Sequence, residues 1–265
     1  MQIDFFEEFP SEASLAPARL WQHPCRVYLA ARDLPEFNRY AALLREIQPL
    51  AKAAFWPILP STYWVSPFTP ARDLMRLQGM LAESPALDVL LDLELPVLSG
   101  RRSRFFTGLP GFFRGKRLIR EILALNHRFL LAVYPAAGRI TQRLLYALGI
   151  DHPDHESCVM YYSSMMPAWL LKQAGRALRH KAERGQRTAG LGCLAPGIFG
   201  TEPVITAEGL GQDLDFCLDA GITRVVLFRL GGLKSDFARI LEEKQTRGDR
   251  AQAASIETAK KIVVD

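Results

Sequence analysis

Residues 87–96 read Leu-Asp-Val-Leu-Leu-Asp-Leu-Glu-Leu-Pro, an apolar run that carries two carboxylates, Asp92 and Glu94, near its end. Successive side chains of a β-strand point to opposite faces, so the two acids share one face, and every second residue from Val89 to Leu95 lies on the other. The apolar face is typical of a strand buried against helices. The stretch therefore predicts a buried strand with an acidic pair at its C-terminal end. Unpaired buried charge costs free energy, so such a pair suggests a functional role.

Seven more segments have strand-like character, and a helical pattern follows each strand. The predicted strands are 2–9, 26–31, 53–59, 87–96, 128–134, 157–163, 188–194 and 223–230. The predicted helices are 11–21, 34–47, 70–82, 117–126, 140–148, 167–184, 208–219 and 235–246. Strict alternation favours parallel strands joined by helical crossovers. Eight such units favour an α/β fold closed into a TIM (β/α)8 barrel.

An open doubly wound sheet is the alternative fold. That fold usually has a glycine-rich first turn, whereas the turn after the first predicted strand reads Glu-Glu-Phe-Pro at 7–10. Composition does not shift along the chain, so we expect one barrel domain over 1–246 and a charged, partly helical tail over 247–265. Pro57 is awkward within the third strand and predicts a bulge or an early end there.

Bulk properties limit the functional classes. The net charge of +5 and pI of about 9.1 suit anionic ligands or a membrane surface, without requiring nucleic acid, and we expect no specific nucleic-acid binding. No apolar run reaches the roughly 18 residues of a membrane span. The first strand leaves no room for a signal peptide, and the cysteines lack metal-ligand spacing, so a reducing, cytoplasmic location is expected. The cysteines are Cys25, Cys158, Cys193 and Cys217.

In a TIM barrel the active site lies at the C-terminal ends of the strands, which sorts the polar residues by position. In the first strand Ile3 and Phe5 alternate with Asp4, Phe6 and Glu8, so the latter three should face the barrel and Glu7 the surface. The predicted acidic set is Glu8, Asp92 and Glu94. The predicted substrate-binding set at the same end is Tyr63, Trp64, Tyr134, Tyr162, Phe228 and Arg229.

The run Asp-His-Pro-Asp-His-Glu at 151–156 has metal-binding residue types. It precedes the sixth strand, however, and therefore lies at the opposite end of the barrel from the expected site. Its spacing matches no standard zinc motif. We expect a solvated turn, and neither a metal site nor a cofactor.

Crowded carboxylates have a direct chemical consequence. Like charges a few ångströms apart raise a pKa, so one acid stays protonated near neutral pH and can donate a proton. Glycoside hydrolysis needs such a donor and a second carboxyl group, and rim aromatics suit stacking on sugar rings. We predict Glu94 as the general acid with Asp92 or Glu8 as its partner. The structural alternative is that these acids pair with a basic side chain such as Arg229 or Arg26.

The strand at 87–96 resembles that of the chitinase-like (family 18) glycoside hydrolases. That family carries Asp-x-x-Asp-x-Asp-x-Glu on strand four; this chain keeps Asp92 and Glu94 and has Leu87 and Leu90 at the earlier positions. The resemblance implies a TIM barrel in which Glu94 is the proton donor. It also implies that Asp92 assists an N-acetyl group of the substrate, which acts as the nucleophile.

Two other strands extend the resemblance. The family reads Met-x-Tyr-Asp on strand six, where this chain has Met-Tyr-Tyr-Ser at 160–163, so the acid is absent. Strand eight commonly ends in Trp there, and in Phe228 here. Strand seven ends in Cys-Leu-Ala-Pro-Gly at 193–197, without the carboxylate of the other large clan of retaining barrel enzymes.

A long loop, 99–117, follows the acidic strand and reads SGRRSRFFTGLPGFFRGKR. Loops of this length tend to be functional. One interpretation is a lid in which Arg101, Arg102 and Arg104 bind a phosphorylated or uronic substrate. A second is contact with a membrane surface through phenylalanines and arginines. A third is a lid that only packs on the barrel rim.

The leading hypothesis is a barrel hydrolase that acts on a glycan or another anionic small molecule. A non-catalytic barrel that binds carbohydrate or a lipid headgroup is the second. The third is a lyase or isomerase of a small anionic substrate, although no lysine lies at a predicted strand end for Schiff-base chemistry.

Overall fold

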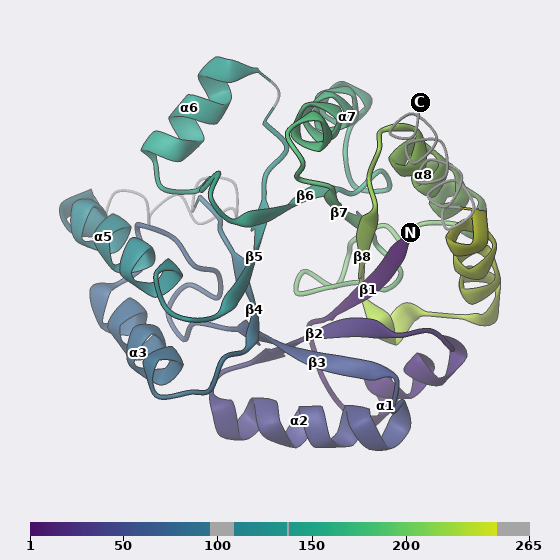
Figure 1. Cartoon of the computed structure of the whole chain (residues 1–265), viewed down its shortest axis with the longest axis horizontal. Coiled ribbons are helices and arrows are strands. Elements are labelled where there is room, and N and C mark those ends of the chain that lie inside the picture. The colour runs from purple at the N-terminus through teal and green to yellow at the C-terminus, as the bar shows by residue number, and fades with distance from the viewer. Residues whose placement is uncertain (96–108, 137, 248–265) are drawn as a thin grey trace, which may run out of the picture.

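Eight parallel strands close into a barrel in chain order, with each strand paired to the next and β8 paired to β1 (Figure 1). The computed structural model describes residues 1–95, 109–136 and 138–247. The strands are β1 (Gln2–Glu7), β2 (Cys25–Ala31), β3 (Ala51–Pro57), β4 (Asp88–Asp92), β5 (Arg128–Val133), β6 (Glu156–Tyr161), β7 (Thr188–Gly192) and β8 (Arg224–Phe228). The predicted TIM (β/α)8 fold is confirmed, and the open doubly wound alternative is wrong.

Helices cover the outside of the barrel. Those described are α1 (Glu12–Leu15), α2 (Leu34–Ile47), α3 (Ala71–Ala82), α5 (Phe112–Leu123), α6 (Arg139–Ala147), α7 (Ala168–Glu183) and α8 (Ala207–Asp219), with a last helix over 235–247. Three 3-10 turns are η1 (Ala16–Leu20), η2 (Leu109–Gly111) and η3 (Leu230–Gly232). The helix predicted at 11–21 is divided into α1 and η1, because Pro17 has no amide hydrogen to continue an α-helix.

Helix α5 begins five residues earlier than predicted, inside the expected loop. Its buried residues Gly115, Leu118, Ile119 and Ile122 recur with helical spacing. Gly115 permits the early start, because a Cβ atom there would lie 2.1 Å from the carbonyl oxygen of Pro67. The close approach of α5 to the loop after β3 therefore needs glycine at this position.

The acidic strand is shorter than predicted but keeps the predicted alternation. Val89 and Leu91 of β4 are fully buried among the helices, while Leu90 faces the barrel interior. Beyond Asp92 the segment pairs with the loop after β3, since Val65 N donates to Asp92 O (2.9 Å) and Glu94 N donates to Val65 O (3.1 Å). Pro57 ends β3 early, as predicted, and this leaves the pairing position to Val65.

The core has two layers. The outer layer lies between strands and helices and contains most of the buried leucine, isoleucine and valine side chains. The inner layer fills the barrel, where the ring of Phe6 lies 5.7 Å from that of Tyr28 and 5.8 Å from that of Trp56. All four cysteines are buried and free.

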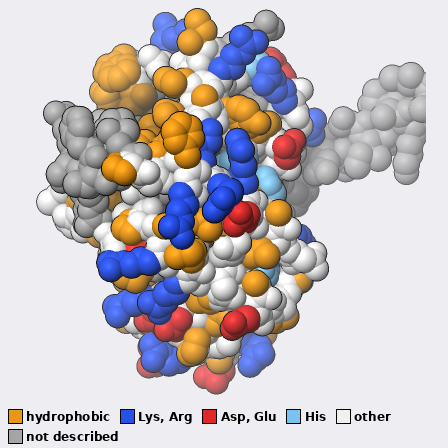
Figure 2. All heavy atoms as spheres, turned by 90° about the vertical axis from the view of Figure 1, so that its left-hand side faces the viewer, with side chains coloured by type: hydrophobic (Ala, Val, Ile, Leu, Met, Phe, Trp, Pro, Cys, Tyr) orange, Lys and Arg blue, Asp and Glu red, His pale blue; other side chains and the backbone are white. Residues whose placement is uncertain are grey.

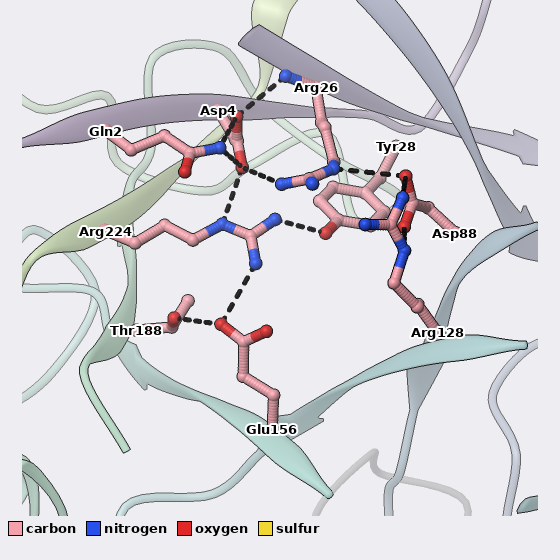
Figure 3. A network of polar contacts seen from close by, with 9 residues as sticks. All are labelled: Gln2, Asp4, Arg26, Tyr28, Asp88, Arg128, Glu156, Thr188 and Arg224. Atoms are coloured by element: carbon pink, nitrogen blue, oxygen red, sulfur yellow. Dashed lines mark hydrogen bonds and ion pairs between the residues drawn. The ribbon is translucent and has the colours of Figure 1, made fainter. Parts of the chain in front are cut away.

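The floor of the barrel, at the N-terminal ends of the strands, is a network of ions (Figure 3). Asp4 is fully buried and accepts hydrogen bonds from Arg26 N (2.7 Å) and Arg224 Nε (2.7 Å). Arg224 also donates to Glu156 (3.0 Å) and to the hydroxyl of Tyr28 (2.6 Å). Asp4 faces the barrel as predicted. Arg26 belongs to this floor network, at the opposite end from the predicted acidic pair.

The turn over 151–156 joins α6 to β6 on the floor side, as predicted, and its groups make local contacts. Lys181 Nζ lies 3.1 Å from Asp151 Oδ1. The side-chain amide of Gln186 donates to the carbonyl oxygens of Pro153 (3.0 Å) and His155 (3.2 Å). These bonds stabilise the turn against α7 and β7.

Several predictions fall outside the described residues. They concern Arg101, Arg102 and Arg104, the loop as far as residue 108, and the tail from 248 to 265. Among the helices that are described, none has the length and apolar character needed to cross a membrane.

Candidate active site

A cavity opens at the C-terminal ends of the strands and contains about 620 Å³ of empty space, part of it open to solvent. Four acids line it: Glu8, Asp92, Glu94 and Glu202. The other lining residues are largely apolar or aromatic: Phe6, Trp56, Trp64, Leu90, Ala132, Met160, Tyr162, Met165, Ile198, Phe199 and Phe228. The predicted residues Glu8, Asp92, Glu94, Trp64, Tyr162 and Phe228 therefore lie around one cavity.

Glu94 lies just beyond β4 and is held by Tyr134, which follows β5. The phenol of Tyr134 donates a hydrogen bond to the carboxylate of Glu94. Burial raises the pKa of Glu94 to about 7, the hydrogen bond from Tyr134 opposes this shift, and the charge of Glu8 adds to it. A carboxyl group with this pKa is partly protonated near neutral pH and can act as an acid there.

Asp92, the last residue of β4, lies deeper in the same wall. Its Oδ1 is buried and has no hydrogen-bond partner. Burial, followed by the charges of Glu94 and Glu8, raises the pKa of Asp92 well above its usual range. Asp92 and Glu94 therefore hold protons near neutral pH that isolated carboxylates would lose.

Glu8 reaches the cavity from the end of β1. The hydroxyl of Tyr63 donates to Glu8 Oε1 at 2.5 Å. Burial raises the pKa of Glu8 to about 7, the bond from Tyr63 lowers it, and the charge of Glu202 raises it. Tyr63 has a φ of 70°, an uncommon left-handed conformation for a bulky residue, and this backbone is held by two hydrogen bonds to Leu59.

The prediction that Glu7 lies at the surface is wrong. Glu7 is fully buried and pairs with Arg229, whose Nε lies 3.5 Å from Glu7 Oε1. It also accepts hydrogen bonds from the backbone N–H groups of Phe9 (3.0 Å) and Gly231 (2.7 Å). The alternation itself holds, because Glu7 is the last residue of β1 and lies on the same outer face as Ile3 and Phe5. That outer face is covered at Glu7 by the η3 turn through Gly231, and not by solvent.

The side chains of Phe228 and Arg229, at the end of β8, point in different directions. Phe228 lines the cavity, whereas the guanidinium of Arg229 is directed to Glu7 and to the carbonyl oxygen of Pro196 (3.0 Å). Arg229 therefore forms its ion pair with the buried Glu7, and its charge lowers the pKa of the cavity acid Glu8 from a greater distance. Among the described residues, none of the four cavity acids forms an ion pair within 4.0 Å.

Glu202 was missed by the sequence reasoning, which considered only the end of strand seven. It lies in the loop between β7 and α8 and accepts a hydrogen bond from Phe199 N (3.0 Å), while its Oε2 is buried without a partner. Gly197 allows this loop to close on the site, because a Cβ there would lie 2.7 Å from Glu8 Oε2. The only signal in the sequence was an acid within a long loop at the working end.

Ser163, the position where the family resemblance expects an acid, points away from the cavity. Its hydroxyl donates to Asp213 Oδ2 on α8 at 2.5 Å. Burial raises the pKa of Asp213 to about 6, although the bond from Ser163 lowers it. Within the described part of the chain, no group of three or more His, Cys, Asp or Glu side chains is arranged to hold a metal ion.

The fold and this cavity define a class: a TIM barrel with a cluster of acids at the C-terminal ends of its strands. No protein-family model and no curated protein sequence matches the chain. Several solved structures are similar to the chain in fold. A GH18 chitinase from Pseudoalteromonas aurantia is similar at a TM-score of 0.56 and 12% identity, over 92% of this chain and 100% of that one.

Two further chitinase structures are similar to this chain at a comparable level. The chitinase of Chromobacterium violaceum has a TM-score of 0.53 at 12% identity, over 92% of this chain and 98% of its own. The GH18 chitinase of Cycas revoluta, solved with allosamidin, has a TM-score of 0.52 at 13% identity, over 92% of this chain and 99% of its own. At this level of identity the likeness establishes the shared TIM-barrel fold.

Proposed function

We propose that this protein hydrolyses a glycosidic bond, with Glu94 as the proton donor. The observation that carries the proposal is the set of four acids in one aromatic-lined cavity. None of them forms an ion pair within 4.0 Å with a described cation, and the pKa values of Glu94 and Glu8 are both raised to about 7. Such crowding keeps protons on carboxyl groups at neutral pH, which general acid catalysis on a glycosidic oxygen requires.

The barrel order supports a division of roles. Asp92 and Glu94 come from β4, whereas Glu8 and Glu202 come from β1 and the β7–α8 loop on the other side of the barrel. A sugar bound between the two groups would meet Glu94 at its leaving oxygen. The carboxylate of Glu8 would then stabilise positive charge at the anomeric carbon or take a proton from the attacking water.

Aromatic side chains supply the expected sugar contacts. Trp64, Tyr162 and Phe228 line the cavity with the acids, and the Tyr162 and Phe228 rings lie 6.1 Å apart. Apolar ring faces of this kind pack on the C–H faces of sugars. The distant structural likeness to chitinases makes β-linked N-acetylglucosamine oligomers the first substrates to test.

The test is hydrolysis of soluble chitin oligosaccharides by the wild type and by Glu94→Gln, with products identified by mass spectrometry. We expect the variant to lose at least about 100-fold in rate, the usual contribution of a general acid, while it still binds the sugar. Glu121→Gln, on the exposed face of α5, is the matched control and should keep the wild-type rate. Equal rates for Glu94→Gln and the wild type would contradict the proposal.

A second candidate is a barrel that binds carbohydrate without turnover. Leu90 favours it: this buried side chain occupies the position where the resemblance expects an aspartate to hold the proton of Asp92. That reading predicts measurable binding of chitin oligosaccharides by calorimetry and no product after prolonged incubation. The same result would refute hydrolysis of these substrates.

A further inference from the structure

Large apolar side chains are exposed on the outer face formed by α3, α5 and α6, and Figure 2 shows hydrophobic side chains on this side of the molecule. Phe113 at the start of α5 is 82% exposed, and Ile140 at the start of α6 is 85% exposed. Leu144, one turn after Ile140, is 55% exposed on the same side of α6. Side chains this exposed protrude from the surface, and large apolar groups in that state mark an interaction surface when they occur together.

The three helices lie on the same side of the barrel and are linked by side-chain contacts. Lys116 Nζ of α5 donates to the carbonyl oxygen of Ala147, the last residue of α6, at 2.5 Å. On the other side, Arg114 Nη2 of α5 lies 3.4 Å from the sulfur of Met75 on α3, and Met75 is itself exposed. We call this surface the α3–α5–α6 face.

The face is strongly basic. Helices α3, α5 and α6 contain eight Lys and Arg residues against two acids. Arg76, Arg114 and Arg143 are exposed and form no ion pair with any described residue. Figure 2 shows Lys and Arg interspersed with hydrophobic side chains over this side of the molecule.

The opposite side of the barrel has no such excess of positive charge, although Lys244 and Arg247 of the last helix pair with Asp215 of α8. Helix α8, which lies across the barrel from α5 in Figure 1, contains four acids and no Lys or Arg. The α3–α5–α6 face is therefore more positive than the side of the barrel that carries α8. An excess of positive charge on one face favours its approach to a negatively charged surface.

We infer that the α3–α5–α6 face binds the surface of an anionic lipid bilayer, with Phe113, Ile140 and Leu144 entering the interface and the arginines meeting lipid phosphates. The exposure of the apolar side chains favours a bilayer over a protein partner. Protruding groups enter a deformable interface directly, whereas a folded partner would need a complementary pocket for each. Arginines around them gain from anionic headgroups at the same depth. This inference is independent of the proposed hydrolysis.

The test is co-sedimentation with vesicles of phosphatidylcholine, with and without about one third phosphatidylglycerol. We expect binding to the anionic vesicles that weakens steeply with added salt, and at least tenfold weaker binding to the neutral ones. Arg114→Gln/Arg143→Gln should weaken binding by about fivefold for each arginine, hence roughly 25-fold. Ile140→Ser/Leu144→Ser should weaken it by about tenfold or more.

Matched controls lie on the other elements. Arg39→Gln/Arg45→Gln on α2 and Leu20→Ser/Leu50→Ser, all exposed positions, should bind as the wild type does, and circular dichroism should show every variant folded. The inference is overturned if the wild type ignores anionic vesicles, or if the control pairs weaken binding as much as the test pairs. It is also overturned if sedimentation velocity shows a dimer that Ile140→Ser/Leu144→Ser dissociates, because the face would then bind a second copy of the chain.

Discussion

Asp4→Asn is a near-isosteric change at the centre of the barrel floor, and its cost follows from the contacts of Asp4. The asparagine oxygen can keep the bond from Arg26 N, but its NH2 group then faces Arg224 Nε, two donors at the present 2.7 Å. Removing one partner of a buried ion pair costs about 3–5 kcal/mol. Arg224 keeps Glu156 and the hydroxyl of Tyr28, so we expect a loss near the lower end, about 3 kcal/mol.

Urea denaturation at neutral pH measures this loss as a change in the free energy of unfolding. For a chain of this size, about 3 kcal/mol also corresponds to a melting point lower by roughly 6–12 °C. Asp219→Asn, at an exposed position of α8, is the control and should stay within about 0.5 kcal/mol of the wild type. A loss below about 1 kcal/mol in Asp4→Asn would refute the reasoning, since it would mean that the floor ions are hydrated. Combining Asp4→Asn with Arg224→Met should cost less than the sum of the single changes, because the two side chains interact directly.

Three further predictions concern Glu94, its partner Tyr134, and two glycines in helices. The pKa of Glu94 is raised to about 7, so its contribution to stability is complete below its ordinary pKa of about 4.5 and is lost as pH rises through 7. At pH 8 the free energy of unfolding of Glu94→Gln should therefore exceed that of the wild type by up to roughly 3 kcal/mol. At pH 4 the difference should be small, and thermal melts at the two pH values measure it. Tyr134→Phe removes a hydrogen bond that lowers the pKa of Glu94, so the loss of activity at alkaline pH should move to higher pH in a profile of kcat/KM; an unmoved limb would remove Glu94 as the acid. Gly115→Ala should lower the free energy of unfolding measured in urea by roughly 1–3 kcal/mol, because its Cβ would collide with Pro67. Gly79→Ala should raise it slightly, because a Cβ there meets nothing within 4 Å and alanine favours the helix. Changes of the same sign in both variants would contradict this packing.

Periodicity in the sequence was sufficient for the fold because it reports which faces are buried. The alternation at 87–95 placed Val89 and Leu91 outside the barrel and Asp92 inside, and the structure confirms each. Repetition of strand and helix eight times then left closure as the favoured arrangement. The ends of the elements do not follow from the alternation. The strand predicted over 87–96 stops at Asp92, because the segment beyond it pairs with Val65 of a loop and not with another strand.

The same periodicity placed Glu8, Asp92 and Glu94 at one end of the barrel, because the ends of parallel strands meet there. Their catalytic roles remain predictions. Two positions were not anticipated. Glu7 keeps the alternation of β1, but its outer face is covered by the η3 turn and not by solvent, and Glu202 lies in a loop that folds back onto the site. Neither result follows from a period of two, because the cover over a strand face and the path of a loop depend on contacts with distant segments.

Alternation of apolar and polar residues by itself determined the class of fold and the end of the barrel that carries the acids. Only the tertiary structure decided which charges neutralise one another. Asp4 meets Arg224 across 220 residues of sequence, Glu7 meets Arg229, and the acids around Glu94 form no ion pair within 4.0 Å with a described cation. The reason is physical. The local alternation of apolar and polar residues indicates which face is buried, whereas electrostatic pairing depends on distances that exist only after the barrel has closed.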